Sequence, residues 1–160
     1  MTPRIETLSP KKLVGKHLTM TLATNPIKTA ELWRSFMPHR NEVKNQVGTD
    51  LISMQVYEEG LEYLSVTPTT EFEKWAATEV SEIEDLPAGM EVFELEGGKY
   101  AVFTHKGLPS DFPKTWKAIF VDWLPSSGFQ LDHRPHFELL PAGYSPVDPN
   151  AEEEVWIPVR

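Results

Sequence analysis

The stretch KYAVFTHKGLPSDFPKTWKAIF, residues 99–120, decides the fold, because one run contains a strand, a proline-containing loop and the start of a helix. Its first residues are rich in Val, Thr and aromatic side chains, which is typical of a short β-strand. A helical spacing then connects the large apolar residues Phe112, Trp116, Ile119, Phe120 and Trp123. Ser110 or Asp111 can cap the N-terminus of this helix, and Gly128 follows its end.

The same pattern occurs 83 residues earlier, in KHLTMTLATNPIKTAELWRSFM, residues 16–37. Aligned without a gap, the two copies share four residues: Lys16 with Lys99, Thr21 with Thr104, Pro26 with Pro109, and Trp33 with Trp116. In the earlier copy a strand again precedes a proline-containing loop and a helix, which Pro38 ends. The sequence therefore predicts an internal duplication.

Each copy returns to strands after its helix. Residues 51–57 and 134–140 lie at the same offset, and residues 75–81 and 154–159 close the two halves, while residues 90–95 bridge them. We predict a single α+β domain, built as a duplicated β-α-β-β repeat over residues 16–81 and 99–159, with antiparallel sheets and one main helix per half. Like halves meet at a pseudo-twofold axis, and we expect a ligand cleft between them.

Composition limits the possible functions. The chain has 160 residues, a net charge of −9 and no cysteine. An acidic chain repels phosphate backbones, so nucleic acid is not an expected partner, and the lack of cysteine excludes disulfides and thiolate chemistry. No apolar run is long enough for a signal peptide or a membrane span. We therefore expect a cytoplasmic protein that makes no membrane contact.

Motifs for cofactors and metals are absent from the sequence. The pair Gly97-Gly98 predicts a hairpin turn, and no phosphate-binding glycine loop or nucleophile elbow is present. His133 and His136 have a spacing that would suit a metal on a helix, but Pro135 between them disfavours that helix, and no third ligand is evident. We predict neither a cofactor nor a metal site.

Glu138 is the most informative charged residue. It lies in HRPHFELLP, residues 133–141, among apolar neighbours, so it is either a solvated strand residue or a buried charge. At the offset of 83 its counterpart is Gln55, which is also polar within an apolar strand and favours a shared polar spot on the inner face. A carboxylate held among apolar groups relieves its desolvation cost by taking a proton or binding a cation.

Most of the chain resembles the GyrI-like small-molecule-binding domain, with the second half matching more distinctly than the first, and we expect residues 1–160 to form one such domain. This domain is also the effector-binding part of multidrug-responsive transcription regulators. The resemblance rests on His105-Lys106-Gly107, the helix with Trp116 that closes in Trp123-Leu124-Pro125, Ser127-Gly128, Phe137-Glu138 and Ile157-Pro158-Val159. It implies a duplicated β-α-β-β fold whose cleft takes lipophilic, often cationic molecules, and it places the buried glutamate of that family at Glu138. Family members often carry Tyr two residues later, where this chain has Leu140 and where the repeat offers Tyr57 as a replacement.

Aromatic side chains complete the expected site, because their faces attract cations and stack on flat ligands. We expect Glu138, Tyr57 and Gln55 to provide its polar groups. Its walls are expected from five further residues: Trp33, Phe36, Trp75, Trp116 and Tyr100. Packing in the core is the alternative for each of these five aromatic residues.

Three functions stay open. The preferred one is a stand-alone protein that binds a lipophilic, cationic small molecule, since no helix-turn-helix pattern precedes the first strand. The second, implied by the resemblance, is a hydrolase of reactive cyclopropane-containing natural products, with Glu138 as general base and Tyr57 as a supporting hydroxyl. The third is a gyrase-inhibitor-like module that binds a basic protein partner.

Overall fold

Eight strands form one antiparallel sheet in the order β1-β6-β8-β7-β3-β4-β2-β5. This is a computed structural model that describes residues 1–160. The strands are β1 (Arg4–Leu8), β2 (Lys11–Thr21), β3 (Leu51–Val56), β4 (Glu71–Val80), β5 (Glu91–Leu95), β6 (Gly98–Lys106), β7 (His136–Leu140) and β8 (Glu152–Pro158). The helices are α1 (Asn25–Phe36) and α2 (Phe112–Lys117), and α2 continues as a π-helical segment, η4 (Ala118–Trp123). The α+β class is confirmed.

The strand order shows the duplication. One repeat supplies β2, β4 and β3, the other supplies β6, β8 and β7, and the two halves join where β3 pairs with β7. The remaining strands are exchanged, because β1 pairs with β6 of the second repeat and β5 pairs with β2 of the first. Each repeat thus begins with a strand that covers the outer edge of the other, and the exchange of β1 was not predicted.

The register corrects the repeat alignment at the centre of the sheet. Glu73 in β4 and Trp156 in β8 are 83 residues apart, but their partners on the inner strands, Val56 and Phe137, are only 81 apart. The connection from helix to inner strand is therefore two residues shorter in the second repeat. Gln55 corresponds to His136, with which it pairs directly, and Tyr57 corresponds to Glu138. The predicted pairs of Gln55 with Glu138 and of Tyr57 with Leu140 are wrong by two residues.

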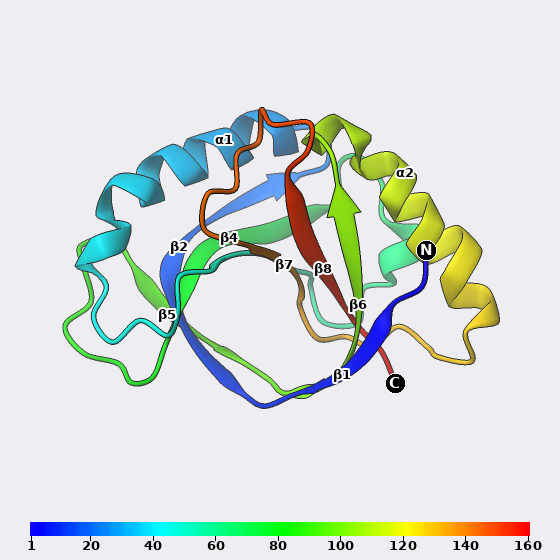
Figure 1. Cartoon of the computed structure of the whole chain (residues 1–160), viewed down its shortest axis with the longest axis horizontal. Coiled ribbons are helices and arrows are strands. Elements are labelled where there is room, and N and C mark those ends of the chain that lie inside the picture. The colour runs from blue at the N-terminus through cyan, green and yellow to red at the C-terminus, as the bar shows by residue number, and fades with distance from the viewer.

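Both helices cover the same face of a strongly curled sheet (Figure 1). Helix α1 packs on the first half through a cluster that includes Leu32, Phe36 and Ala76. Helix α2 and η4 pack on the second half through a cluster that includes Phe103 and Ile119. Neither helix is long and apolar enough to cross a bilayer. The helices leave a gap between these two clusters, and the functional candidates converge there.

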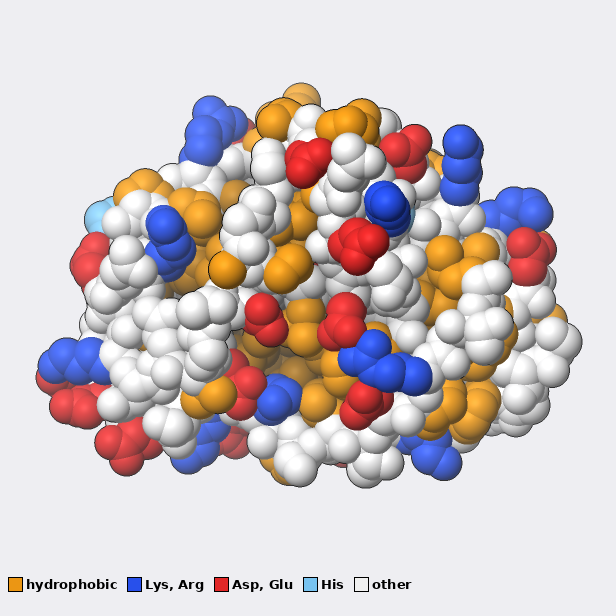
Figure 2. All heavy atoms as spheres, viewed as in Figure 1, with side chains coloured by type: hydrophobic (Ala, Val, Ile, Leu, Met, Phe, Trp, Pro, Cys, Tyr) orange, Lys and Arg blue, Asp and Glu red, His pale blue; other side chains and the backbone are white.

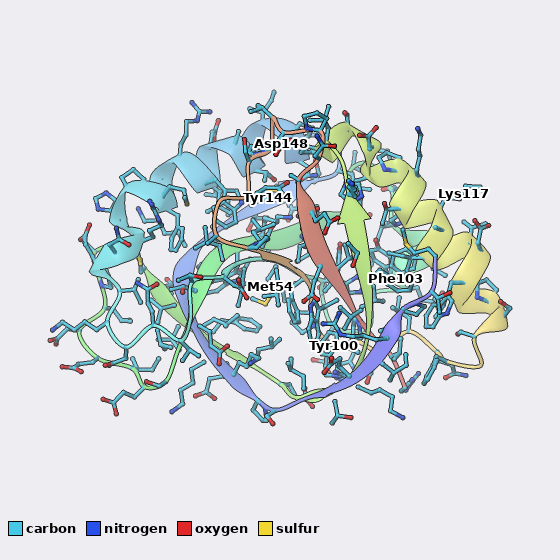
Figure 3. The ribbon with its side chains drawn as sticks, in the orientation of Figure 1. Met54, Tyr100, Phe103, Lys117, Tyr144 and Asp148 are labelled. Atoms are coloured by element: carbon cyan, nitrogen blue, oxygen red, sulfur yellow. The ribbon has the colours of Figure 1, made fainter.

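The opposite face of the sheet is also buried, because the sheet curls around its own core. Met54, Trp75, Tyr100 and Phe137 belong to this inner core, and Leu95 of the exchanged strand β5 contributes to it. Figure 3 shows Met54 and Tyr100 inside the curl and Phe103 between β6 and α2. With both faces covered, alternation along a strand separates two buried sets of side chains, not a buried set from a solvated one.

Three of the predicted cleft aromatics are buried core residues, and a fourth, Trp33, is partly buried against a core. Trp75 and Tyr100 lie in the inner core, on the face of the sheet that the helices do not cover. Phe36, the last residue of α1, is completely buried against the sheet. Trp33 of the same helix packs edge-on against it, with 5.8 Å between ring centroids. These four residues pack in or against the two cores, and none of them lines the cavity.

Charged side chains of both signs are present on the face of the molecule that Figure 2 shows. Figure 2 shows acidic and basic side chains interspersed on one face, with hydrophobic side chains at the bottom of a hollow near its lower centre. The net charge of −9 is thus not gathered into one acidic patch on this face.

Candidate functional site

A cavity of about 320 Å³ lies between the two halves, on the face of the sheet that the helices cover. Two thirds of its residues are hydrophobic, and both repeats contribute to it. The floor comes from β3, β4, β7 and β8, and the walls come from α2 and from the connection between β3 and β4. The predicted location of the cleft between the halves is thus the location of the cavity.

Glu138 and Gln55 form the polar centre of the floor. Gln55 Nε2 donates a hydrogen bond to Glu138 Oε2 at 3.0 Å. Glu138 is half-buried and lines the cavity, and its neighbour across the ladder is Ser53. The carboxylate is therefore held in place by one amide while its other oxygen has no protein donor. This oxygen is therefore free to accept a hydrogen bond from a ligand or to contact its positive charge.

Aromatic rings form one wall of the cavity and hold one another in position. Trp116 donates from Nε1 to the hydroxyl of Tyr63 at 2.9 Å, and its ring packs against Phe120 with 5.3 Å between centroids. Tyr63 also contacts Tyr57, at 5.1 Å between centroids. Because these rings are fixed by mutual contacts, binding of a flat apolar ligand would cost the protein little side-chain entropy.

Burial also changes the acid–base behaviour of this wall. It raises the pKa of Tyr63 to about 12 and raises the pKa of Tyr57 well above its ordinary value, with the charge of Glu138 adding to both shifts. Both phenols are therefore neutral hydrogen-bonding groups at physiological pH. Neither supplies a phenolate for catalysis.

His136 lies at the centre of the floor, paired with Gln55 across the axis between the halves. Rings of Tyr57, Tyr63 and Phe120 surround it, the closest being Tyr63 at 4.6 Å between centroids. Burial lowers the pKa of His136 to about 3. The imidazole is thus neutral near pH 7, and it offers the cavity a polar edge without a charge.

Lys74 brings a positive charge to the same floor. Its strand position pairs with Gln55, so one row across the sheet reads Lys74, Gln55 and His136. The residue is only 7% exposed and lines the cavity. A second carboxyl group, that of Glu153, is close enough for its pKa to respond to both Glu138 and Lys74.

The structure brings together four of the predicted site residues. Glu138, Gln55, Tyr57 and Trp116 all line the cavity. Trp33, Phe36, Trp75 and Tyr100 lie outside it, in the cores described above. Ligand binding by the four cavity residues stays a prediction. No group of three or more histidine and acidic side chains is arranged to hold a metal ion.

Several cavity residues were missed by the sequence analysis: Tyr63, Phe72, Lys74, Phe112, Phe120 and His136. Phe112 and Phe120 had a usable signal, because they lie four residues to either side of Trp116 and so share its face of the helix. Phe72 and Lys74 were missed because the strand β4 begins at Glu71, four residues before the predicted strand at residues 75–81. Tyr63 lies in a short helical turn, η2 (Tyr63–Ser65), which has no periodic signal.

Comparison with known families matches the whole chain, residues 1–160, to the GyrI-like small-molecule-binding domain. The chain belongs to the GyrI-like family. As a GyrI-like domain it has the duplicated fold and the cleft between halves that the sequence resemblance implied, and the resemblance is confirmed.

Known proteins that this GyrI-like domain resembles include a regulator and two solved structures. The transcriptional regulator BrlR of Pseudomonas aeruginosa is 29% identical over 134 residues, which are 81% of this chain and 45% of BrlR, so the match spans about half of that regulator. The structure of SAV2435 bound to tetraphenylphosphonium has a TM-score of 0.75 at 16% identity, covering 100% of this chain and 94% of SAV2435. A hydrolase encoded by lin2189 from Listeria innocua has a TM-score of 0.63 at 10% identity, covering 99% and 92%. At such identities the two structures show the fold alone.

Proposed function

We propose that this GyrI-like domain binds lipophilic aromatic molecules that carry a positive charge, with the aromatic part against the ring wall and the charge near Glu138. The observation that carries the proposal is the position of the Glu138 carboxylate in the floor of an apolar cavity, with one oxygen held by Gln55 and the other without a protein donor. A carboxylate that is partly desolvated gains more from an organic cation than a carboxylate in water does.

The ring wall supports the same ligand chemistry. Trp116, Tyr63 and Phe120 present aromatic faces within one cavity, and each such face attracts a cation by about 0.5 to 2 kcal/mol. The cavity of about 320 Å³ is within the lower range of small-molecule pockets. The neighbour SAV2435, which has the same fold, was solved with tetraphenylphosphonium, a lipophilic cation without any hydrogen-bonding group.

Calorimetric titration of tetraphenylphosphonium tests this proposal. We expect binding to the wild type and a loss of about ten- to a hundredfold in affinity for Glu138→Gln, the range for removal of a charged partner. Glu94→Gln is the matched control, because Glu94 is exposed on β5 and its substitution removes the same charge far from the cavity. Equal affinities of Glu138→Gln and Glu94→Gln would remove Glu138 from the site.

A hydrolase is the second candidate, because the Glu138 oxygen without a protein donor could activate a water molecule against a bound electrophile. The fold likeness to the Listeria innocua hydrolase is consistent with it. Incubating the protein with a cyclopropane-containing electrophile and separating the mixture by chromatography distinguishes the two functions. A binding protein returns the compound unchanged, whereas a hydrolase yields a product whose formation requires Glu138.

A further inference from the structure

The side chain of Lys74 is the least expected feature of the cavity. It is 7% exposed, it lines the cavity, and no hydrogen bond or ion pair joins its ammonium group to another protein group. Among the fully enclosed side-chain nitrogens and oxygens, only Arg134 Nη1 lacks a hydrogen-bond partner. The Lys74 ammonium also lacks a partner but is not fully enclosed, so it borders the accessible space of the cavity. A buried ammonium without a partner is costly, and an acceptor that arrives with a ligand would relieve that cost.

The nearby carboxyl groups do not neutralise Lys74. Gln55 lies beside it on β3, and the Glu138 carboxylate accepts its hydrogen bond from Gln55, not from Lys74. Burial raises the pKa of Glu153 to about 8, so this carboxyl group holds its proton at pH 7. The floor thus presents a positive group on β4 and a negative group on β7, with β3 between them, so the backbones of these two strands lie about 10 Å apart.

Such an arrangement acts differently on two kinds of aromatic cation. A cation without acceptors is attracted by Glu138 but repelled by Lys74, and it leaves the ammonium group unpaired. A cation that also carries a carboxylate or another strong acceptor satisfies both ends of the floor. Specificity then follows from the unpaired group, because a ligand that leaves a buried charge unsatisfied loses affinity.

We propose that Lys74 is a specificity residue and that the cavity selects aromatic cations that also carry an anionic or strongly accepting oxygen group, which binds the Lys74 ammonium while the cation lies near Glu138. This inference rests on the proposed binding function and narrows its ligand class to zwitterionic or acceptor-bearing aromatic molecules. The geometry that carries this inference is the row of Lys74, Gln55 and His136 across the floor. Glu138 lies two residues after His136 on β7, on the same face of the sheet.

Two probes of nearly equal size test the proposal: pentyltriphenylphosphonium and (4-carboxybutyl)triphenylphosphonium. They share the aromatic cation and differ in the carboxylate at the end of the chain. We expect calorimetric titration of the wild type to show at least about tenfold tighter binding of the carboxylated probe. In Lys74→Met this preference should disappear, with the pentyl probe binding more tightly and the carboxylated probe more weakly than in the wild type.

Controls separate the possible outcomes. Lys12→Met removes the same charge from an exposed position on β2 and should keep the wild-type preference. Lys74→Gln keeps a polar side chain in the floor, and it carries the test if circular dichroism shows that Lys74→Met is unfolded. A preference that Lys74→Met and Lys74→Gln both retain would overturn the role of Lys74 while leaving the binding function intact. Absence of binding by either probe to the wild type would overturn both.

Discussion

Gln55 and Glu138 are joined by a hydrogen bond of 3.0 Å that crosses the junction between the two repeats, from Nε2 of the amide to Oε2 of the carboxylate. The bond links β3 to β7, the only strand pair that joins the two halves side by side at the centre of the sheet. The amide orients the one carboxylate of the cavity floor that faces the proposed ligand. The junction of the halves and the candidate site are therefore the same place.

Gln55→Glu tests this bond directly. Two carboxylates at hydrogen-bonding distance repel each other, so we expect the variant to be destabilised at pH 7.5 by about 1 to 3 kcal/mol, measured by urea unfolding. The deficit should shrink as the pH falls towards 4, because one proton shared by the pair restores a hydrogen bond. Equal stability of variant and wild type at pH 7.5 would show that the two side chains do not meet.

The ring wall should behave as a coupled unit. Trp116→Phe and Tyr63→Phe each remove one partner of the bond between Trp116 Nε1 and the Tyr63 hydroxyl but keep an aromatic ring. In a double-mutant cycle on the free energy of unfolding, we expect a coupling energy of about 1 kcal/mol between the two substitutions. Strict additivity would contradict the contact. Both single variants should also weaken binding of tetraphenylphosphonium, since each loosens a wall of the cavity.

Glu153 should make stability decline on the alkaline side. Burial, with a further contribution from the charge of Glu138, raises its pKa from 4.5 to about 8, while Lys74 opposes the rise. Its contribution to stability is complete below pH 4.5 and is lost as the pH rises through 8, because the unfolded chain releases the proton that the folded chain retains. Glu153→Gln should therefore stabilise the protein more at pH 9 than at pH 5 in urea unfolding. Glu152→Gln, a substitution of its exposed neighbour, serves as the control.

His136 should have the opposite effect on the acid side. Burial lowers its pKa from 6.5 to about 3, so the folded chain keeps the imidazole neutral where the unfolded chain takes a proton. The stability that this residue supplies is complete above pH 6.5 and is lost as the pH falls towards 3. His136→Phe keeps a flat ring among the aromatic side chains and should flatten the acid side of the stability profile.

Tyr100 distinguishes the inner core from the cavity. Its hydroxyl donates to the carbonyl of Pro135 at 2.9 Å, and the Arg134 guanidinium lies 4.7 Å from the centroid of its ring. Tyr100→Phe should reduce the free energy of unfolding by about 1 kcal/mol and leave the affinity for tetraphenylphosphonium at the wild-type value. A marked loss of affinity in a Tyr100→Phe variant that remains fully folded would show that Tyr100 belongs to the ligand site.

The elements of the fold were largely predictable because their signals are local. Helical spacing from Phe112 to Trp123 and the proline after the first helix marked both helices, and the repeat marked equivalent strands in both halves. The two-residue error in the inner strands did not harm the site prediction. A shift of two residues keeps a side chain on the same face of a strand, so Gln55 and Glu138 still meet in one cavity.

The composition of the cavity could not be predicted to the same extent. Trp75 and Tyr100 carry the same apolar strand signal as Phe72, yet they belong to the inner core and Phe72 lines the cavity. The ambiguity arises because both faces of this sheet are buried, one by the helices and the other by the curl of the sheet and its exchanged edge strands. Alternation identifies two faces, but it does not say which of them faces the ligand space.

The sequence by itself thus determined the duplicated α+β architecture, the cleft between halves and the central place of Glu138, since these depend on periodicity, turn residues and order along the chain. Only the tertiary structure decided which aromatic rings wall the cavity and that Lys74 shares its floor with Glu138. That decision depends on how far the sheet curls and how the strands pair, and both follow from contacts between residues distant in the chain.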